Sequence, residues 1–204
     1  MNPTRRLLLQ AATLAAAPWA WPAAAEQQRG VGFRVGDSYS YRVRDPISMA
    51  VTGQFTSVVT EVSAEEVMFS TGLVTDLRGN TRRNPAGKDL TPRQEFPPEY
   101  EVGRRWFTSY QYLQRDGQTW RMDLEGVVAA FEEVSCPAGT FDAYRIELKG
   151  WETGLRPLRS YVYTTWMAPG RVRAPLIRES INRVASVIVP NSYRIELVAF
   201  EQAA

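Results

Sequence analysis

The chain has 204 residues, 24 of them basic and 22 acidic, with a single cysteine and no histidine. Without histidine it cannot form Ser-His-Asp or Cys-His nucleophilic sites, and it lacks the commonest zinc and copper ligand. Its nearly balanced charge gives no indication of nucleic-acid binding, which usually requires a basic excess on one face. We therefore expect no metal, no cofactor and no nucleic-acid partner.

Residues 1–25 have the features of an export signal. Arg5 and Arg6 precede a modestly apolar run that ends in three alanines at 23–25, a pattern typical of signal-peptide cleavage. The segment 4–10 (TRRLLLQ) resembles the twin-arginine export signal, with an ordinary secretory signal as the alternative. The run is too short and too interrupted by proline to span a membrane. We expect cleavage after Ala25 and a periplasmic protein that does not span the membrane.

The remaining residues, 26–204, are predicted to form a single β-rich domain with about nine strands and little helix. Segments rich in β-branched and aromatic residues alternate with Gly, Pro, Asn and Asp, and no window beyond the leader repeats apolar residues with a helical period. The expected strands are 37–45, 51–62, 66–75, 105–115, 118–135, 140–151, 158–167, 172–183 and 192–201. The longest, 118–135, is expected to bend or bulge at Gly126.

Turn residues connect several of these segments directly. Asp116-Gly117 is a strong hairpin signal, and the segment 137–139 (PAG) suits a three-residue hairpin loop. Strands joined by such short turns pair antiparallel. The expected fold class is therefore all-β, built on an antiparallel sheet.

Residues 76–103 interrupt this pattern with a polar stretch that is rich in proline. We expect a long loop there, and long loops in compact domains are usually functional lids or disordered segments. Its basic side chains are interpreted as a solvated face in preference to an anion site. They are Arg78, Arg82, Arg83 and Lys88.

Four short segments resemble landmarks of a group of uncharacterised exported proteobacterial proteins, related to domain-of-unknown-function families. They are 102–106 (VGRRW), 134–143 (VSCPAGTFDA), 165–172 (TWMAPGRV) and 196–200 (ELVAF). The chain departs from the pattern at Cys136, where valine is usual, and at Arg171. The resemblance covers about 97–201 and implies an open, strongly curved antiparallel half-barrel, similar to the lipoprotein carriers LolA and LolB. It implies no known activity.

Aromatic residues are the most prominent candidates for a binding site. Because side chains alternate along a strand, Trp106, Tyr110 and Tyr112 share one face of the strand 105–115. Trp120 and Met122 share one face of the next strand, across the Asp-Gly turn. These five side chains could form one aromatic wall. The wall is either part of a packed core or the lining of a pocket for an apolar or amphiphilic ligand.

Acidic residues offer a weaker indication of catalysis. Glu132 and Glu133, with Asp123 and Glu125 upstream, are in principle a source of paired carboxylates for glycoside hydrolysis. Neighbours on a strand point to opposite faces, so Glu132 and Glu133 cannot act together. We interpret them as a solvated strand edge. The chain also has no glycine-rich phosphate loop or dinucleotide-binding pattern.

The one cysteine, Cys136, cannot form an internal disulfide. In an oxidising compartment it is either buried or available to another thiol. Its position just before a predicted turn favours a buried structural thiol.

The pentapeptide YRIEL occurs twice, at 144–148 and at 193–197. Its alternation predicts two half-buried strands of one antiparallel sheet, and the two strands expected between the copies argue against direct pairing. Strict alternation places Trp151 and Phe200 on the charged faces. They are either an exposed aromatic pair or core residues reached through a bulge.

These features together favour an exported, non-enzymatic binding or carrier protein for a hydrophobic or amphiphilic ligand in the cell envelope. The partner would be a lipid-like small molecule. An alternative is an interaction or assembly protein that docks an envelope protein through its sheet edge or aromatic face. A carboxylate-dependent enzyme that acts on saccharides is the third hypothesis.

Overall fold

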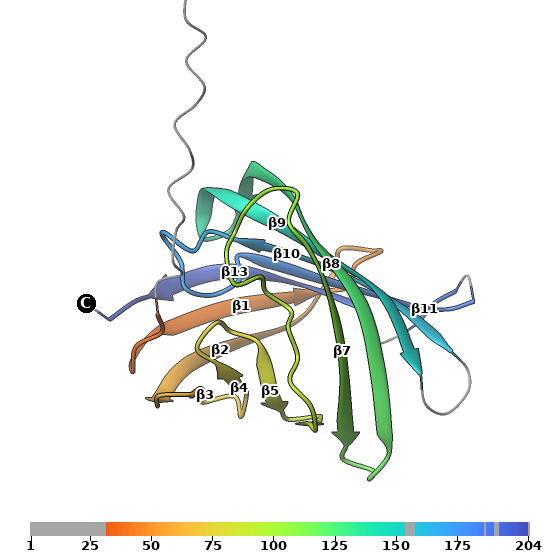
Figure 1. The fold of residues 1–204 in the computed structure, drawn as a ribbon. Coiled ribbons are helices and arrows are strands. Elements are labelled where there is room, and N and C mark those ends of the chain that lie inside the picture. Colours follow the sequence, from red (N-terminus) through yellow and green to blue (C-terminus); the bar gives the residue numbers. More distant parts are fainter. Residues whose placement is uncertain (1–31, 154–157, 186, 190–191, 204) are drawn as a thin grey trace, which may run out of the picture.

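The computed structural model describes residues 32–153, 158–185, 187–189 and 192–203, so the expected export signal lies outside the described residues. The described part of the chain contains thirteen strands and no helix, and so no helix able to cross a membrane (Figure 1). The strands are β1 (Ser38–Arg44), β2 (Val51–Val62), β3 (Glu66–Phe69), β4 (Val74–Asp76), β5 (Thr81–Asn84), β6 (Gly87–Asp89), β7 (Arg105–Gln114), β8 (Thr119–Cys136), β9 (Gly139–Thr153), β10 (Arg159–Met167), β11 (Ile177–Val184), β12 (Val187–Ile188) and β13 (Tyr193–Glu201).

The strands form one antiparallel sheet that closes on itself. Their order is β10-β9-β8-β7-β6-β5-β4-β3-β2-β1-β13-β11-β12, and β10 also pairs with β11. Twelve strands therefore complete a ring, while the two-residue β12 pairs with β11 alone. The all-β antiparallel prediction is confirmed. The predicted half-barrel of nine strands is wrong, because the molecule is a closed barrel of twelve.

Short polar strands account for most of this difference. The predicted strand 66–75 is divided into β3 and β4 by a turn at Gly72, whose φ is +81°. The predicted loop 76–103 contains β5 and β6, and β6 pairs with β7. Apart from Thr81, their sequences, TRRN and GKD, lack the β-branched and aromatic residues that mark a strand. Together with β4, the strands β5 and β6 connect β3 to β7, and the ring can therefore close.

The sequence predicts a bend or a bulge at Gly126, but the pairing of β8 with β9 is continuous there, so the predicted bulge is wrong. The register instead shifts between Val128 and Ala130. Gly126 has a different function, since a Cβ atom there would lie 2.3 Å from the indole of Trp106 on β7. The glycine thus makes room for a large aromatic side chain on the inner face of the barrel.

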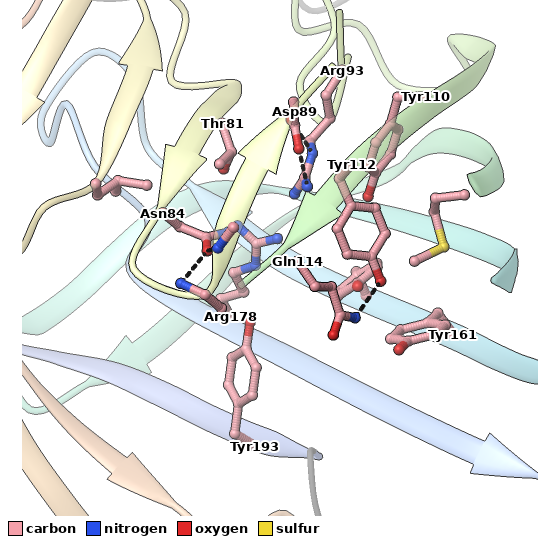
Figure 2. A pocket seen from close by; sticks show the side chains of 15 residues that line it. Thr81, Asn84, Asp89, Arg93, Tyr110, Tyr112, Gln114, Tyr161, Arg178 and Tyr193 are labelled. Carbon is pink, nitrogen blue, oxygen red and sulfur yellow. Dashed lines mark hydrogen bonds and ion pairs between the residues drawn. The ribbon is translucent and has the colours of Figure 1, made fainter. Parts of the chain in front are cut away.

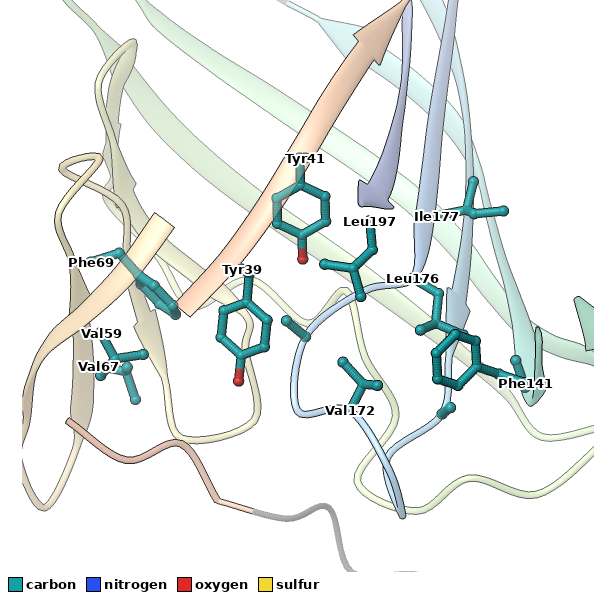
Figure 3. Close-up of a cluster of buried hydrophobic side chains, with 13 residues drawn as sticks. Tyr39, Tyr41, Val59, Val67, Phe69, Phe141, Val172, Leu176, Ile177 and Leu197 are labelled. Carbon is teal, nitrogen blue, oxygen red and sulfur yellow. The ribbon is translucent and has the colours of Figure 1, made fainter. Parts of the chain in front are cut away.

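Two clusters of buried side chains fill the interior. Figure 3 shows the first, built around β1, β13 and the chain that leads into β11. Its members are Tyr39, Tyr41, Val59, Val67, Phe69, Phe141, Ala143, Ala168, Val172, Ala174, Leu176, Ile177 and Leu197. The second comprises Phe96, Tyr110, Met122, Leu124, Ile146, Leu148, Tyr161 and Met167.

The two YRIEL copies lie on strands that are not neighbours. β9 pairs with β8 and β10, whereas β13 pairs with β1 and β11. The prediction that the copies do not pair directly is therefore confirmed. Ile146 and Leu197 are both buried in the interior, as half-buried strand patterning requires.

The buried carboxylate of Asp37 links the start of the described chain to Arg173 and to the chain's other end. Asp37, which is fully buried just before β1, accepts hydrogen bonds from Arg173 Nη1 at 2.7 and 2.9 Å. The backbone N–H of Ala203, beyond β13, donates to the same carboxylate at 2.9 Å. Burial alone would raise the pKa of Asp37, but the contacts with Arg173 and the backbone N–H groups lower it below its usual value.

Replacing Gly126 with alanine should destabilise the protein. The added methyl group would overlap the Trp106 ring, and overpacking of this kind typically lowers the free energy of unfolding by about 1–3 kcal/mol. Gly53→Ala in β2 is the matched control, because its Cβ would meet Val43 only at 3.9 Å. Urea unfolding measures both variants, and an equal loss in the two would contradict this account of Gly126.

Candidate functional site: a tyrosine-lined chamber inside the barrel

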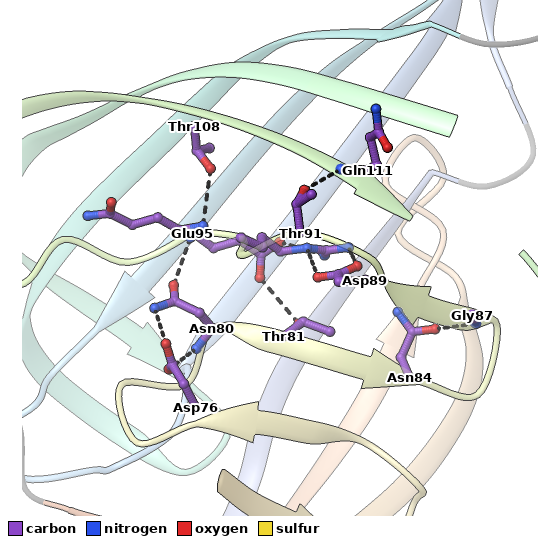
Figure 4. Close-up of polar contacts among 12 residues, drawn as sticks. Asp76, Asn80, Thr81, Asn84, Gly87, Asp89, Thr91, Glu95, Thr108 and Gln111 are labelled. Atoms are coloured by element: carbon purple, nitrogen blue, oxygen red, sulfur yellow. Dashed lines mark hydrogen bonds and ion pairs between the residues drawn. The ribbon is translucent and has the colours of Figure 1, made fainter. Parts of the chain in front are cut away.

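The chain between β6 and β7 crosses the inside of the barrel, and we name residues 90–100 the crossing segment (Figure 1). Asn80 holds it: Asn80 Oδ1 accepts hydrogen bonds from the backbone N–H groups of Glu95 at 2.7 Å and Phe96 at 2.8 Å (Figure 4). Asp76 in turn orients Asn80 by accepting from its backbone N–H and from Nδ2, both at 2.9 Å. Gly79, with φ of +88°, makes the tight turn between them.

Strand β7 holds the other side of the crossing segment. The hydroxyl of Thr108 accepts from the N–H of Gln94 at 3.1 Å, and Trp106 Nε1 donates to the carbonyl of Gln94 at 3.0 Å. The hydroxyl of Thr91 accepts from the N–H of Gln111 at 2.8 Å. Part of the predicted polar loop is therefore an internal element, and it brings charged side chains into the barrel.

Those charged side chains form a buried network. Glu95 receives Arg178 Nη2 of β11 at 2.7 Å and Arg93 Nη1 at 3.2 Å. Arg93 also makes an ion pair with Asp89, with Nε 2.8 Å from Oδ2. Burial alone would raise the pKa of Glu95, but the two guanidinium groups lower it to about 2. The network of two acidic and two basic groups carries no net charge.

A second internal carboxylate is held by tyrosines. Glu152 of β9 is 2% exposed, and it accepts hydrogen bonds from the hydroxyls of Tyr112 and Tyr161, the latter at 3.0 Å. Arg159 Nη1 lies 3.9 Å from the same carboxylate. Burial and the neighbouring carboxylate raise the pKa of Tyr161 to about 12, so its hydroxyl stays protonated at neutral pH.

These groups surround a cavity of about 450 Å³, which we name the tyrosine chamber (Figure 2). Its walls come from β5, β6, β7, β8, β10, β11 and β13, so it lies inside the barrel. It is lined by Leu73, Thr81, Asn84, Ala86, Gly87, Asp89, Arg93, Tyr110, Tyr112, Gln114, Met122, Tyr161, Tyr163, Arg178 and Tyr193. Five tyrosines thus supply ring faces and hydroxyls, while the charged groups are matched in pairs.

A smaller cavity of about 160 Å³, the apolar chamber, adjoins the first. Leu73, Thr81 and Arg178 line both chambers. Six aromatic rings belong to the remaining wall, namely those of Phe33, Tyr39, Tyr41, Phe55, Phe69 and Phe96. The interior therefore offers a polar, aromatic space beside an apolar one.

The predicted aromatic wall faces the interior but is divided between two roles. Tyr110, Tyr112 and Met122 line the tyrosine chamber. Trp106 packs over Gly126, and Trp120 lies under the guanidinium of Arg159, whose Cζ is 5.8 Å from the ring centroid. Those two tryptophans do not line the chamber, and Trp106 packs against the second core cluster instead.

Trp151 and Phe200 do not form an exposed pair. Trp151 is 53% exposed on β9, whereas Phe200 lies opposite Tyr39 and packs against the first core cluster. The register between β1 and β13 shifts so that Val198 is bypassed, which turns Phe200 inward. The bulge alternative is thus correct for Phe200.

The other sequence candidates are structural or lie on the surface. Cys136 is a free, half-buried thiol that packs against the first core cluster, and burial raises its pKa. Glu132 accepts hydrogen bonds from Arg145 Nε at 3.1 Å and Trp166 Nε1 at 2.9 Å. Of the basic residues expected on a solvated face, Arg78, Arg83 and Lys88 are exposed and Arg82 is half-buried.

The charged part of the site escaped the sequence analysis. Arg93 and Glu95 lie in a segment whose composition indicates a solvated loop, and nothing in the sequence indicates that it enters the barrel. Tyr161 and Tyr163 could have been found, because aromatic residues at alternate positions of the strand 158–167 predict a shared face. In the structure their rings stack with centroids 5.6 Å apart.

No protein-family model and no curated protein matches the chain. Solved structures do share its fold. A protein described as a lipoprotein from Parabacteroides distasonis has a TM-score of 0.55 at 11% identity, over 86% of this chain and all of its own length. The hypothetical lipoprotein YmcC of Escherichia coli has a TM-score of 0.53 at 13% identity, over 83% and 85% of the two chains.

A third neighbour is described as an exported protein with a YmcC-like fold from Bacteroides fragilis. Its TM-score is 0.50 at 10% identity, over 85% of this chain and 99% of its own. The chain has a YmcC-like fold. The neighbours agree with the expected resemblance to exported β-rich proteins, while the individual sequence landmarks stay predictions.

Replacing Glu95 with Gln should lower the free energy of unfolding at neutral pH. It should also reduce the amount of stability that the protein loses in acid. The change leaves Arg93 and Arg178 without their shared carboxylate, which should lower the free energy of unfolding at neutral pH by about 3 kcal/mol. The pKa of Glu95 is about 2 in the folded protein, against a usual value of 4.5. The native carboxylate therefore stabilises the fold above about pH 5, and this contribution is lost as the pH falls towards 2.

Urea unfolding at several pH values, followed by tryptophan fluorescence, measures both effects. Glu99→Gln serves as the control, because Glu99 forms an exposed ion pair with Arg104 at 2.9 Å. If Glu95→Gln kept the wild-type loss of stability in acid, Glu95 would not be the titrating group.

Proposed function

We propose that the chain is an exported binding or carrier protein that holds a small amphiphilic ligand inside its barrel. The observation that carries the proposal is the tyrosine chamber, a cavity of about 450 Å³ lined by strands of the barrel. Small-molecule pockets typically occupy about 300–1,000 Å³, with aromatic walls and a few placed polar groups. The chamber fits that description in size, and its five tyrosines supply the aromatic part of the wall.

The lining indicates the chemistry of the ligand's polar part. Burial raises the pKa of Tyr110, Tyr112 and Tyr163, so their hydroxyls stay protonated and can both donate and accept hydrogen bonds. Asn84 and Gln114 add amide groups. Because each guanidinium in the wall already has a carboxylate partner, a neutral, hydroxyl-bearing head group suits the chamber better than an anion.

The internal carboxylates support binding in preference to catalysis. Glu95 is engaged by two arginines, and Glu152 by two tyrosine hydroxyls. A general acid or base needs a lone pair or proton that can reach the substrate. Carboxylates committed to internal partners are better suited to fix the wall than to transfer protons.

An envelope location completes the proposal. The export signal predicted in residues 1–25 and the exported or lipoprotein descriptions of proteins with this fold support a periplasmic site of action. The alternative of docking through a sheet edge is less favoured, because every strand of the closed ring has a partner on both sides.

Protein purified from the periplasm of an export-competent bacterial host should carry a small molecule that native mass spectrometry detects. Gln114→Leu removes an amide group from the chamber, and we expect it to weaken ligand binding about fivefold. The fraction of protein that carries the ligand should fall accordingly. Gln111→Leu, on the outer face of the same strand, is the matched control and should leave occupancy unchanged.

Two results would contradict the proposal. One is a wild-type protein with no bound compound, both by native mass spectrometry and after solvent extraction. The other is a stoichiometric protein partner whose binding responds to neither glutamine variant, which would favour the docking alternative.

A further inference from the structure

A groove on the outer face of the barrel brings together three basic side chains that the proposed function does not use. Arg82 and Arg83 lie on β5 and Lys88 lies on β6, and all three line a cavity of about 380 Å³, which we name the basic groove. Lys88 points outward, because its neighbours Gly87 and Asp89 both line the tyrosine chamber and side chains alternate along a strand.

An irregularity in β5 directs both arginines to this groove. Strict alternation would place Arg83 on the same face as Thr81, which lines the tyrosine chamber. Two neighbouring residues of β4 pair with Thr81 and Arg83, however, so Arg82 has no partner in β4 and is the extra residue of a β-bulge. Bulges often re-aim a side chain next to a functional site. This one turns Arg83 outward, beside Arg82 in the wall of the groove.

The three cations repel one another and have no ion-pair partner in the described part of the chain. Arg83 and Lys88 lie directly opposite each other on paired strands, and like charges in that arrangement are destabilising. None of the three side chains makes a hydrogen bond with another described residue. Asp89 also borders the groove, but its carboxylate is bound by Arg93, whose Nε lies 2.8 Å from Oδ2. An anion in the groove would therefore offset a repulsion that the fold leaves unbalanced.

The rest of the lining indicates a small organic anion. Val74 is 3% exposed and pairs with Arg83, so it forms an apolar floor. Leu90 and Pro92, at the start of the crossing segment, add apolar surface to the wall. Glu66 on β3 is the remaining charged group, and it reduces the excess in the groove to two positive charges. A phosphate monoester carries a charge of about −1.5 to −2 at neutral pH, which matches this excess better than the single charge of a carboxylate.

We propose that the basic groove binds a phosphate monoester, with Arg83 and Lys88 as the main phosphate ligands and Arg82 beside them. A guanidinium group can bind two phosphate oxygens at once, and an ammonium group adds a compact positive charge. The organic part of the ligand lies against the apolar floor. Because the groove is on the outer face, this inference goes beyond the proposed function and does not depend on it. The ligand is either a soluble compound or a lipid head group with the same chemistry.

Isothermal titration calorimetry of the purified protein with glycerol 3-phosphate tests the site. The affinity should fall as NaCl is added, because salt screens exposed charges. Arg83→Gln and Lys88→Gln should each weaken binding about tenfold, as expected when a charged hydrogen-bond donor is lost. Arg105→Gln is the matched control, because Arg105 is exposed on β7 and does not line the groove. It should leave the affinity unchanged.

Two measurements separate binding from folding. Glu66→Gln removes the opposing negative charge of the groove, so it should bind glycerol 3-phosphate about threefold more tightly. Lys88→Gln removes the repulsion with Arg83, so its urea midpoint without ligand should equal or exceed that of the wild type. A variant that is no less stable but binds more weakly has lost a ligand contact, not its fold.

Vesicles of phosphatidylcholine with and without phosphatidic acid decide the source of the phosphate. Co-sedimentation that requires phosphatidic acid and is lost in Lys88→Gln assigns the groove to a membrane head group. Binding of glycerol 3-phosphate without co-sedimentation assigns it to a soluble compound. The inference is wrong if neither probe binds at low salt, or if Arg83→Gln and Lys88→Gln bind as the wild type does. Neither result bears on the ligand of the tyrosine chamber.

Discussion

The carboxylate of Glu95 holds the interior of the barrel together. It lies in the crossing segment and binds Arg178 of β11 on one side and Arg93 on the other. A charge at this depth is tolerated only because both partners are present and Asn80 fixes the local backbone. The position of the crossing segment, and therefore the shape of both chambers, depends on this one buried group.

The number of strands explains why such a segment is needed. A barrel of eight strands is just wide enough for its own side chains to fill, whereas wider barrels enclose open space. Here twelve strands close the ring, and residues 90–100 occupy part of the additional volume. Phe96 joins the second core cluster, while Arg93 faces the tyrosine chamber. The crossing segment thus completes the core and shapes the cavity at the same time.

Local sequence patterns predict the long strands and the orientation of their side chains. Aromatic and β-branched residues that alternate with polar ones predict seven of the strands, namely β1, β2, β7, β8, β9, β10 and β13. The same alternation predicts that Tyr110, Tyr112 and Met122 point inward. Closure of the ring could not be predicted, because β5 and β6 are short and polar. The course of Arg93 and Glu95 through the interior depends on contacts made far away in sequence, which no local pattern encodes.

The pairing of β1 with β13 has a consequence for how the protein folds. Ser38 lies opposite Glu201, so the ring joins the two ends of the described chain. Bringing together segments so distant in sequence has a large entropic cost, and contacts of this type form slowly. The hairpins β7–β8 and β8–β9 can form early, because their strands are neighbours along the chain. The ring closes only when β13 joins β1, so both chambers take their final form at the last stage of folding.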